Sequence, residues 1–348
     1  MKATDIFKDE KFIECLKKGT FDEKGNHIKI FNEENEIIEE NVKKVTKINC
    51  FNYRIANIDG ISIFINLKYL YLSNNQIKEL PKEISRLKNL KYLSLFDNKI
   101  EELPKEIGNL EKLEILDLSN NQIKELPKEI GNLKNLKVLR LYYNKIKKIP
   151  NKMGKLKNLK ELNLFHNQIE ELPKEIWNLE NLKELNLNFN QIKEIPKEIS
   201  ELNKLKELNL SYNKIKRLPE EIWNLKNLKK LYLHHNKLQW LPKEIKNLKK
   251  LEILDLSEDK LQWLPKEILE LDKLKKIRLY KAFDLNNLKQ DPKELFNILK
   301  KLKDKNIFYD YELKYLEKEV YPLLIKEKYK ITDLKQIKDN LNLDNINF

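Results

Sequence analysis

Few residues in this 348-residue chain could carry covalent or metal chemistry. The four histidines include one adjacent pair, His234 and His235, and such a pair holds a transition metal only if further ligands lie close by. The nearest other histidine in that region, His166, precedes the pair by three copies of a sequence repeat, roughly 15 Å when copies stack at strand spacing. We therefore expect no metal site and no cofactor.

Catalytic motifs are also absent from the sequence. The six glycines form neither a Walker loop nor a G-x-G-x-x-G turn, and the motifs C-x-x-C, H-E-x-x-H and G-x-S-x-G do not occur. The sequence thus predicts a protein that is not an enzyme.

Side chains suited to non-covalent binding are, by contrast, concentrated in the middle of the chain. Aromatic residues and histidines recur there with a period of 23 residues, as Tyr142, Tyr143, Phe165, His166, Phe189, Tyr212, His234 and His235. Exposed, rigid aromatic side chains are frequent anchors of protein interfaces, so we interpret this series as the core of a partner-binding surface. The alternative is that the rings only stack on one another along a sheet and stabilise it.

Charged residues accompany the aromatic series. Glu161, Glu184 and Glu207 share one position of the repeat, and Arg140 and Lys230 flank this acidic triplet. Such a surface would complement a partner that carries basic and apolar groups.

A pair of tryptophans forms a second candidate contact. Trp240 and Trp263 occupy equivalent positions in two successive copies of the repeat, where most copies have Glu. Because large aromatic side chains are enriched at interfaces, this pair is a second place where a partner could bind.

All of these spacings follow from one 23-residue pattern, which fills residues 67–273 with nine copies and no insertion. Each copy reads L-x-x-L-x-L-x-x-N-x-I/L-x-x-L/I-P-x-x-I/M-x-x-L. Self-similarity at a fixed period in this range predicts a stacked solenoid, in which each turn contacts only its neighbours. A solenoid presents a long, regular surface, which favours binding over catalysis.

The positions within a copy predict how each turn is built. The alternation in L-x-x-L-x-L indicates a strand that points its leucines into the core. The asparagine at position nine, replaced by Asp259 in the last copy, can bond to backbone groups of its own turn and the next and so form a ladder. The proline at position fifteen suits the first position of a short helix, which we expect to be 3₁₀ or one to two helical turns.

This pattern resembles leucine-rich-repeat proteins of the short subclass whose repeats carry Leu-Pro-x-x-Ile, over about 60% of the chain. That subclass occurs in bacterial repeat proteins, including host-directed effectors, and in animal scaffolds of small-GTPase signalling. The resemblance implies a right-handed α/β solenoid with a parallel concave sheet, short helical turns on the convex side, and a protein partner bound on the concave sheet in signalling or host interaction. Some similar effectors end in a ubiquitin ligase with a catalytic cysteine, but no cysteine follows Cys50 here.

The two ends depart from the pattern and are expected to cap the solenoid. Residues 45–66 keep the core spacing but have Tyr53 where the asparagine belongs, and residues 274–283 begin a further turn. We therefore expect an N-terminal cap over 1–44, a solenoid over 45–283 (degenerate at 45–66, regular at 67–273, partial at 274–283) and a helical C-terminal cap over 284–348. Within that cap, Asp291-Pro292 is a helix start, and further helical segments are expected near 309–328 and 332–341.

The net charge of +14 raises nucleic acid or an anionic surface as an alternative partner. Only five of the 69 basic residues are arginine, and most copies place Lys beside Glu. Because arginine supplies the bidentate contact that phosphate sites favour, we favour a protein partner over nucleic acid. The basic excess is greatest in two copies, 136–158 and 228–250.

The cysteine content predicts a reducing compartment. Extracellular repeat proteins of this kind often close their ends with several disulfides, whereas this chain has only Cys15 and Cys50. We expect both thiols to be free, with Cys50 buried at a core leucine position, and a single bridge between them is the alternative. The N-terminus lacks the apolar segment of a signal peptide, and no stretch of 18 uncharged apolar residues occurs. We therefore expect a cytoplasmic monomer without a membrane span, and export by a signal-independent route stays open.

Overall fold

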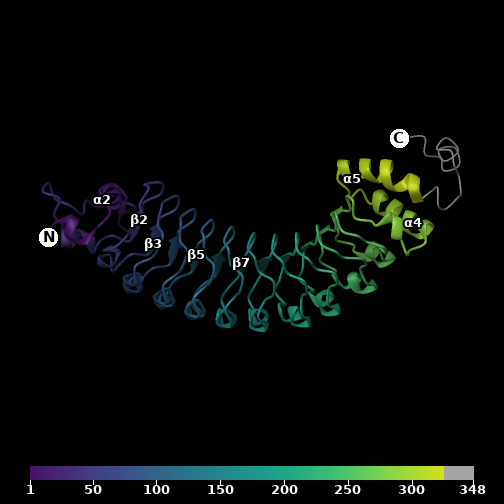
Figure 1. Cartoon of the computed structure of the whole chain (residues 1–348), viewed down its shortest axis with the longest axis horizontal. Helices are drawn as coiled ribbons and strands as arrows, with labels where there is room; N and C mark the ends of the chain where they lie inside the picture. Colours follow the sequence, from purple (N-terminus) through teal and green to yellow (C-terminus); the bar gives the residue numbers. More distant parts are fainter. Residues whose placement is uncertain (325–348) are drawn as a thin grey trace. The chain divides into compact units, whose positions relative to one another are not determined.

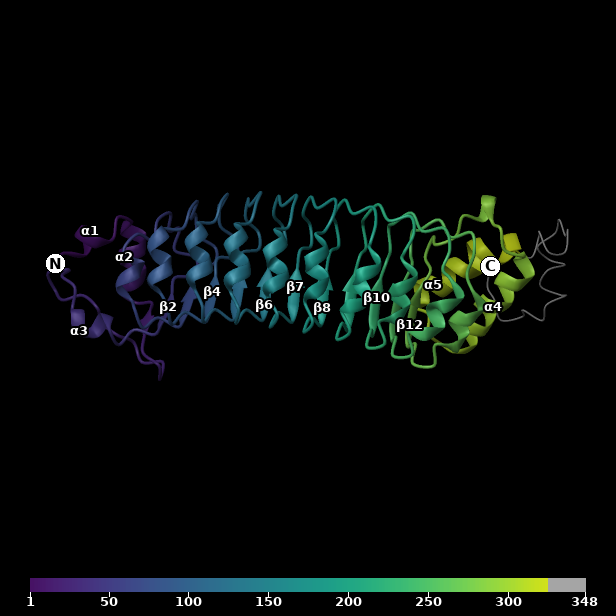
Figure 2. The same cartoon turned by 90° about the horizontal axis from the view of Figure 1, so that it is seen from below.

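The computed structural model describes residues 1–324. The chain divides into two compact units, Met1–Asn190 and Gln191–Phe348, and the boundary falls within the sixth copy of the repeat. Both units are built from the same kind of turn, a three-residue strand followed by a 3₁₀ segment (Figures 1 and 2). The predicted solenoid architecture therefore holds on both sides of the boundary.

Unit 1 (residues 1–190) begins with three short helices, α1 (Ala3–Ile6), α2 (Glu10–Leu16) and α3 (Glu39–Val42). Strand β1 pairs antiparallel with β2, and from β2 to β8 the strands pair in parallel and in sequence order. The strands are β1 (Thr20–Phe21), β2 (Lys47–Asn49), β3 (Tyr69–Tyr71), β4 (Tyr92–Ser94), β5 (Ile115–Asp117), β6 (Val138–Arg140), β7 (Glu161–Asn163) and β8 (Glu184–Asn186). The 3₁₀ segments lie on the side opposite the strands and are η1 (Ile61–Ile63), η2 (Lys82–Arg86), η3 (Lys105–Asn109), η4 (Lys128–Asn132), η5 (Asn151–Lys155) and η6 (Lys174–Asn178) (Figure 1).

Unit 2 (residues 191–348) continues the same pattern, and strands β9 to β12 pair in parallel and in sequence order. The strands are β9 (Glu207–Asn209), β10 (Lys230–Tyr232), β11 (Ile253–Asp255) and β12 (Lys276–Arg278). The 3₁₀ segments are η7 (Lys197–Glu201), η8 (Glu220–Asn224), η9 (Lys243–Asn247), η10 (Lys266–Glu270) and η11 (Leu285–Asn287). Two helices follow, α4 (Pro292–Asp304) and α5 (Asp310–Tyr315), with a π-helical turn η12 (Leu316–Val320) after α5.

The third copy of the repeat shows how each turn is held. Leu113, Leu116 and Leu118 at positions one, four and six are completely buried, as predicted. The prediction for position fifteen was wrong by one residue, because Pro127 precedes the 3₁₀ segment η4 instead of being its first residue. Its carbonyl accepts the N–H of Ile130 at 3.0 Å, and the ring fixes φ at −64° where the chain enters the turn.

The asparagine ladder is present, although it runs in the direction opposite to the one predicted. The side-chain amide of Asn98 donates to the carbonyls of Leu95 on its own turn (3.1 Å) and Leu72 on the preceding turn (2.9 Å). Its carbonyl oxygen accepts the N–H of Ile77, also on the preceding turn, at 3.0 Å. Because these backbone groups are buried, each asparagine satisfies polar atoms that would otherwise destabilise the turn. In unit 1 the same bonds recur at Asn121, Asn144, Asn167 and Asn190.

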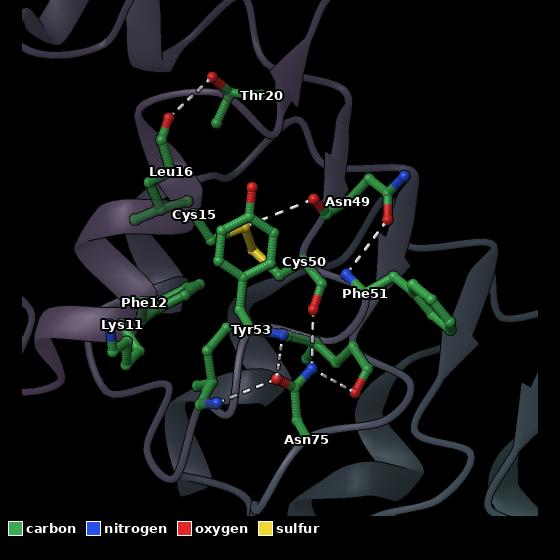
Figure 3. Close-up of a disulfide and its surroundings, with 12 residues drawn as sticks. Lys11, Phe12, Cys15, Leu16, Thr20, Asn49, Cys50, Phe51, Tyr53 and Asn75 are labelled. Carbon is green, nitrogen blue, oxygen red and sulfur yellow. Dashed lines mark hydrogen bonds between the residues drawn. A yellow bond between two sulfur atoms is a disulfide. The ribbon is translucent and has the colours of Figure 1, made fainter.

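The N-terminal cap is joined to the first turn by a disulfide between Cys15 and Cys50 (Figure 3). The prediction of two free thiols was therefore wrong, whereas the predicted burial of Cys50 is confirmed. The helix α2 approaches the first turn because Asp9 caps α2 with one carboxylate oxygen and accepts the N–H groups of Ala56 and Asn57 with the other. This packing brings the two Cα atoms to 5.6 Å, within the usual range for a disulfide.

The end of unit 2 is closed by side chains that take the place of a following turn. The amide of Gln290 pairs with both the N–H and the carbonyl of Leu264, each at 2.9 Å. A carboxylate oxygen of the buried Glu312 accepts the N–H of Leu279 at 2.9 Å. Burial raises the pKa of Glu312, because surroundings with little water disfavour the ionised carboxylate.

Two of the helices expected within 284–348 are present in the described residues. Helix α4 begins at Pro292, and the side chain of Asp291 caps it by accepting the N–H of Glu294 at 3.0 Å. The predicted 309–328 segment corresponds to α5 and η12, and Leu323 in it is exposed where burial was expected. The predicted helix at 332–341 lies outside the described residues.

Candidate functional site

Position eight of every copy has a left-handed backbone, which sequence reasoning did not predict. This conformation suits Asn and Asp, which fill the position in the first three copies, but it costs bulky side chains about 1 kcal/mol or more. Local backbone preference therefore does not explain why later copies carry aromatic residues there. The φ angles lie between 51° and 56° at Asn74, Asp97, Asn120, Tyr143, His166, Phe189, Tyr212, His235 and Glu258.

The predicted aromatic series is divided between the two units, and the larger part lies in unit 1. We call Tyr142, Tyr143, Phe165, His166 and Phe189 the unit 1 aromatic cluster. The ring of Tyr143 lies 5.0 Å from that of Phe165 and 4.6 Å from that of His166, and His166 stacks on Phe189 at 5.7 Å. The rings thus contact one another, as the stacking alternative requires, yet Tyr143 and Phe189 remain 45% and 39% exposed. The cluster therefore combines contacts between its rings with exposed aromatic surface.

The acidic triplet is partly neutralised by the basic residues that flank it. In unit 1, Arg140 forms two hydrogen bonds with the carboxylate of Glu161, at 2.9 and 3.3 Å. These bonds raise the pKa of Arg140. In unit 2, Lys230 pairs with Glu207 at 2.9 Å. Glu184 is exposed, and no ion pair to it occurs within residues 1–324, so it is the member of the triplet whose charge is not neutralised by a basic side chain.

The remaining members of the series gather in unit 2. The ring of Tyr212 lies 4.1 Å from that of His235 and 5.1 Å from that of His234. His235 contacts the carboxylate of Glu258 at 3.1 Å. These three rings are half-buried, so they expose less apolar surface than Tyr143 and Phe189 do.

A serine, a histidine and an aspartate meet beside this group without forming a catalytic triad. The Nδ1 atom of His234 lies 2.8 Å from the hydroxyl of Ser211 and 3.2 Å from a carboxylate oxygen of Asp255. A triad uses the two ring nitrogens separately, one toward the nucleophile and one toward the acid. Here one nitrogen serves both contacts, and Ser211 is completely buried. Burial opposes ionisation of Asp255, but its hydrogen bond to His234 and the histidine charge hold its pKa below the ordinary value.

Trp240 and Trp263 lie side by side in unit 2 and line a groove of about 680 Å³. Their backbones form a parallel bridge, and the two side chains are 41% and 39% exposed. The guanidinium of Arg217, at the same position of the preceding turn, lies 5.0 Å from the ring centre of Trp240. Prolines and the glutamines that precede the tryptophans complete the floor of the groove.

Many surface lysines pair with carboxylates of a neighbouring turn, which reduces the charge available to a polyanion. In the most basic copy, 136–158, Lys137 pairs with Glu114 at 2.5 Å and Lys157 with Glu180 at 2.8 Å. Arg140 in the same copy pairs with Glu161. These pairs neutralise three of the eight basic residues of that copy.

Residues 1–324 contain no group of three His, Cys, Asp or Glu side chains that could hold a metal ion. No helix within this range is long and apolar enough to cross a bilayer.

The repeats match two family models, one described as a leucine-rich repeat region over residues 85–194 and one described as a leucine rich repeat over 50–100 and 180–238. Among curated protein sequences, none matches the chain. A leucine-rich-repeat protein of Leptospira interrogans is 34% identical with a TM-score of 0.61, and the match covers 84% of this chain and 85% of that one.

Two proteins of Listeria monocytogenes have similar structures. Internalin C2 is 26% identical with a TM-score of 0.55 over 68% of this chain and 96% of its own. The internalin InlF is 21% identical with a TM-score of 0.55 over 82% and 94%, and this likeness concerns the fold alone. With family models matched between residues 50 and 238 and a family member at 34% identity over most of both chains, this protein belongs to the leucine-rich-repeat proteins.

Proposed function

We propose that this protein is a non-catalytic scaffold that binds a protein partner on the strand side of unit 1, through the unit 1 aromatic cluster. The observation that carries the proposal is the aromatic side chains at a left-handed position, Tyr143 and Phe189, which stay exposed. The left-handed backbone disfavours aromatic residues at this position, and the rings are not fully buried, so their burial does not offset that strain. A partner that covers the rings would supply the stabilisation by burying their exposed surface.

The family supports this proposal. Leucine-rich-repeat proteins are typically protein-interaction scaffolds and not enzymes, and a solenoid offers an extended surface instead of a deep pocket. The constant 23-residue period with Leu-Pro-x-x-Ile favours the short subclass, and the similar structures come from bacteria. A role in signalling or host interaction is consistent with both.

The charges beside the cluster favour a partner of particular chemistry. Arg140 and Glu161 satisfy each other in a bidentate pair, which leaves Glu184 as the unit 1 acid that a partner can reach. A partner segment with apolar side chains and one basic residue would cover the rings and complement Glu184. Tyr212, His234 and His235 in unit 2 stay candidates for further contacts.

The disulfide favours an oxidising compartment for this function over the predicted cytoplasm. The cytoplasmic prediction depended in part on free thiols at Cys15 and Cys50, and both are bridged. Structural disulfides persist outside the cytosol, where glutathione and thioredoxin do not reduce them. A partner on a cell surface or in a periplasm fits this environment.

A pair of substitutions taken from the protein's own repeats tests the proposal. Tyr143→Asn and Phe165→Ser introduce the residue types that the third copy carries at positions eight and seven, so the turn can still form. We expect the double variant to lose partner capture from native and host lysates by at least about tenfold, because clustered aromatic anchors dominate interface energies. The readout is the amount of each captured protein, quantified by mass spectrometry against the wild type.

The matched control is Tyr69→Glu, which removes an exposed aromatic residue elsewhere in unit 1 and introduces the type found at Glu161. Capture should survive this change, and all three proteins should melt at similar temperatures. Undiminished capture by the double variant would contradict the proposal. Capture that falls steeply with added salt and includes nucleic acid would instead favour binding through the excess lysines.

A further inference from the structure

The groove beside Trp240 and Trp263 departs from the repeat at two neighbouring positions at once. Positions twelve and thirteen are both charged in each of the first seven copies, and three of these copies have Lys-Glu. In the eighth and ninth copies both positions become uncharged, as Gln239-Trp240 and Gln262-Trp263. Because seven copies build the same turn with charged residues, the fold does not require the Gln-Trp pairs.

The two tryptophans also differ from the others in this chain. Trp177 and Trp223 are only 1% exposed and fill the interior of their turns. Trp240 and Trp263 instead present about two-fifths of their surface to the groove, on adjacent turns whose backbones form a parallel bridge. The exposed indole surface is in contact with water, which is unfavourable for an apolar group. A ligand stacked on the rings would cover this surface and remove the unfavourable contact.

One residue that lines the groove has a side-chain oxygen without a hydrogen-bond donor. The side-chain oxygen of Gln262 is buried and has no hydrogen-bond partner among residues 1–324. The backbone of Gln262 is fixed on both sides, since its N–H donates to the carbonyl of Gln239 at 2.7 Å and its carbonyl accepts from Lys289 and Gln290. A buried acceptor of this kind is normally satisfied, so a ligand O–H or N–H that reached this oxygen would remove an unfavourable unpaired acceptor.

The charged residues that line the groove balance, and the guanidinium of Arg217 over the ring of Trp240 adds one positive charge beside it. Three ammonium groups and three carboxylates line it, on Lys243, Lys266, Lys289, Glu244, Glu267 and Glu294. A polyanion would meet the three carboxylates, and a polycation would meet the three ammonium groups. The balance favours an uncharged ligand that can accept hydrogen bonds from one set and donate to the other.

We propose that this groove binds a neutral carbohydrate chain, with sugar rings stacked on Trp240 and Trp263. A pyranose has an apolar C–H face for the indole and hydroxyl groups at its edge for the glutamine amides and the charged rim. Neighbouring turns are about 4.8 Å apart, which is comparable with the length of one sugar residue, so successive residues can meet successive turns. A proline-rich peptide could stack on the same rings, but proline has no N–H to donate to the oxygen of Gln262.

Cellohexaose, maltohexaose and chitohexaose serve as probes, titrated into the full chain by isothermal calorimetry and by indole fluorescence. The test variant carries Gln239→Lys, Trp240→Glu, Gln262→Lys and Trp263→Glu, which introduces the Lys-Glu pair that three other copies have and so preserves the turn. We expect the wild type to bind at least one of the three sugars and this variant to bind it at least about tenfold more weakly.

The unit 1 variant Tyr143→Asn with Phe165→Ser is the matched control, and it should bind the sugar as the wild type does. The proposal is overturned if none of the three sugars binds, or if the Lys-Glu variant binds equally well. It is also overturned if a proline-rich peptide or heparin binds at the groove and the neutral sugars do not. Because the control removes only the unit 1 aromatic cluster, failure here leaves the proposed protein-binding function unaffected, and the converse also holds.

Discussion

The last member of the asparagine ladder is an aspartate, and this makes the stability of unit 2 depend on pH. Asp259 accepts the N–H of Leu238 at 3.1 Å, but its second carboxylate oxygen is buried without a partner. In the preceding copy the amide of Asn236 donates to the carbonyls of Leu210 and Leu233 at 2.9 and 2.7 Å. An ionised carboxylate cannot make such donations, whereas a protonated one can make one of them. Burial accordingly raises the pKa of Asp259 to about 8.

The direction and size of the effect follow from this pKa. Because the folded-state pKa lies above the ordinary value of 3.8, the native state binds a proton that the unfolded chain releases. Stability is then greatest below about pH 4 and falls by about 1.4 kcal/mol for each pH unit up to about pH 8. Relative to the stability at about pH 4, the loss caused by Asp259 therefore reaches about 4 kcal/mol near pH 7. Asp259→Asn restores both donations and removes the titration, so we expect it to stabilise the protein by about 2–4 kcal/mol near pH 7.

Urea unfolding of the wild type and of Asp259→Asn, followed by circular dichroism from about pH 4 to about pH 8, measures this difference. The gain should shrink at the acidic end to about 1 kcal/mol, because the protonated wild-type carboxyl makes one of the two donations and Asn makes both. Asn236→Asp is the matched control, because it places the same carboxyl one turn earlier and should create the same pH dependence. A stability difference that does not change with pH, or an Asp259→Asn variant that is less stable at neutral pH, would refute the reasoning.

Three further predictions concern the fold. Asn167→Ala should destabilise the protein by about 1–3 kcal/mol, measured by urea unfolding, because it leaves buried backbone groups unpaired. Gly131→Ala should cost about 1–3 kcal/mol, because the new Cβ would lie 2.1 Å from a backbone oxygen of the next turn; an unchanged melting temperature would contradict this close approach. Cys50→Ser should cost about 2–4 kcal/mol under oxidising conditions and little in the presence of dithiothreitol, since the bridge closes a separation of 35 residues.

The periodic part of the molecule could be predicted from the sequence because each residue in a solenoid has nearly the same surroundings in every copy. The burial of Leu116 and Leu118, the strand before them and the 3₁₀ segment after them all follow from spacing within 23 residues. The start of α4 at Pro292 could also be predicted from neighbouring residues alone, because a capping aspartate directly precedes it. Errors at this level were small: Pro127 lies one residue before its helix, and the ladder of Asn98 reaches backward instead of forward.

The candidate sites depended on contacts that spacing does not encode. Only the tertiary structure shows that position eight is left-handed, although Asn74 and Asn120 were a signal of it, and this conformation makes the aromatic residue at Tyr143 unexpected. The pairing of Arg140 with Glu161 likewise depends on side-chain directions across two turns.

The sequence by itself determined the solenoid, its core and the rows of residues on its surface, because these repeat with the chain. The tertiary structure alone decided the disulfide and the closure of unit 2 by Glu312. The physical reason is that these features join segments outside the repeat to the regular turns. Their geometry depends on how each cap packs, and no sequence period constrains that packing.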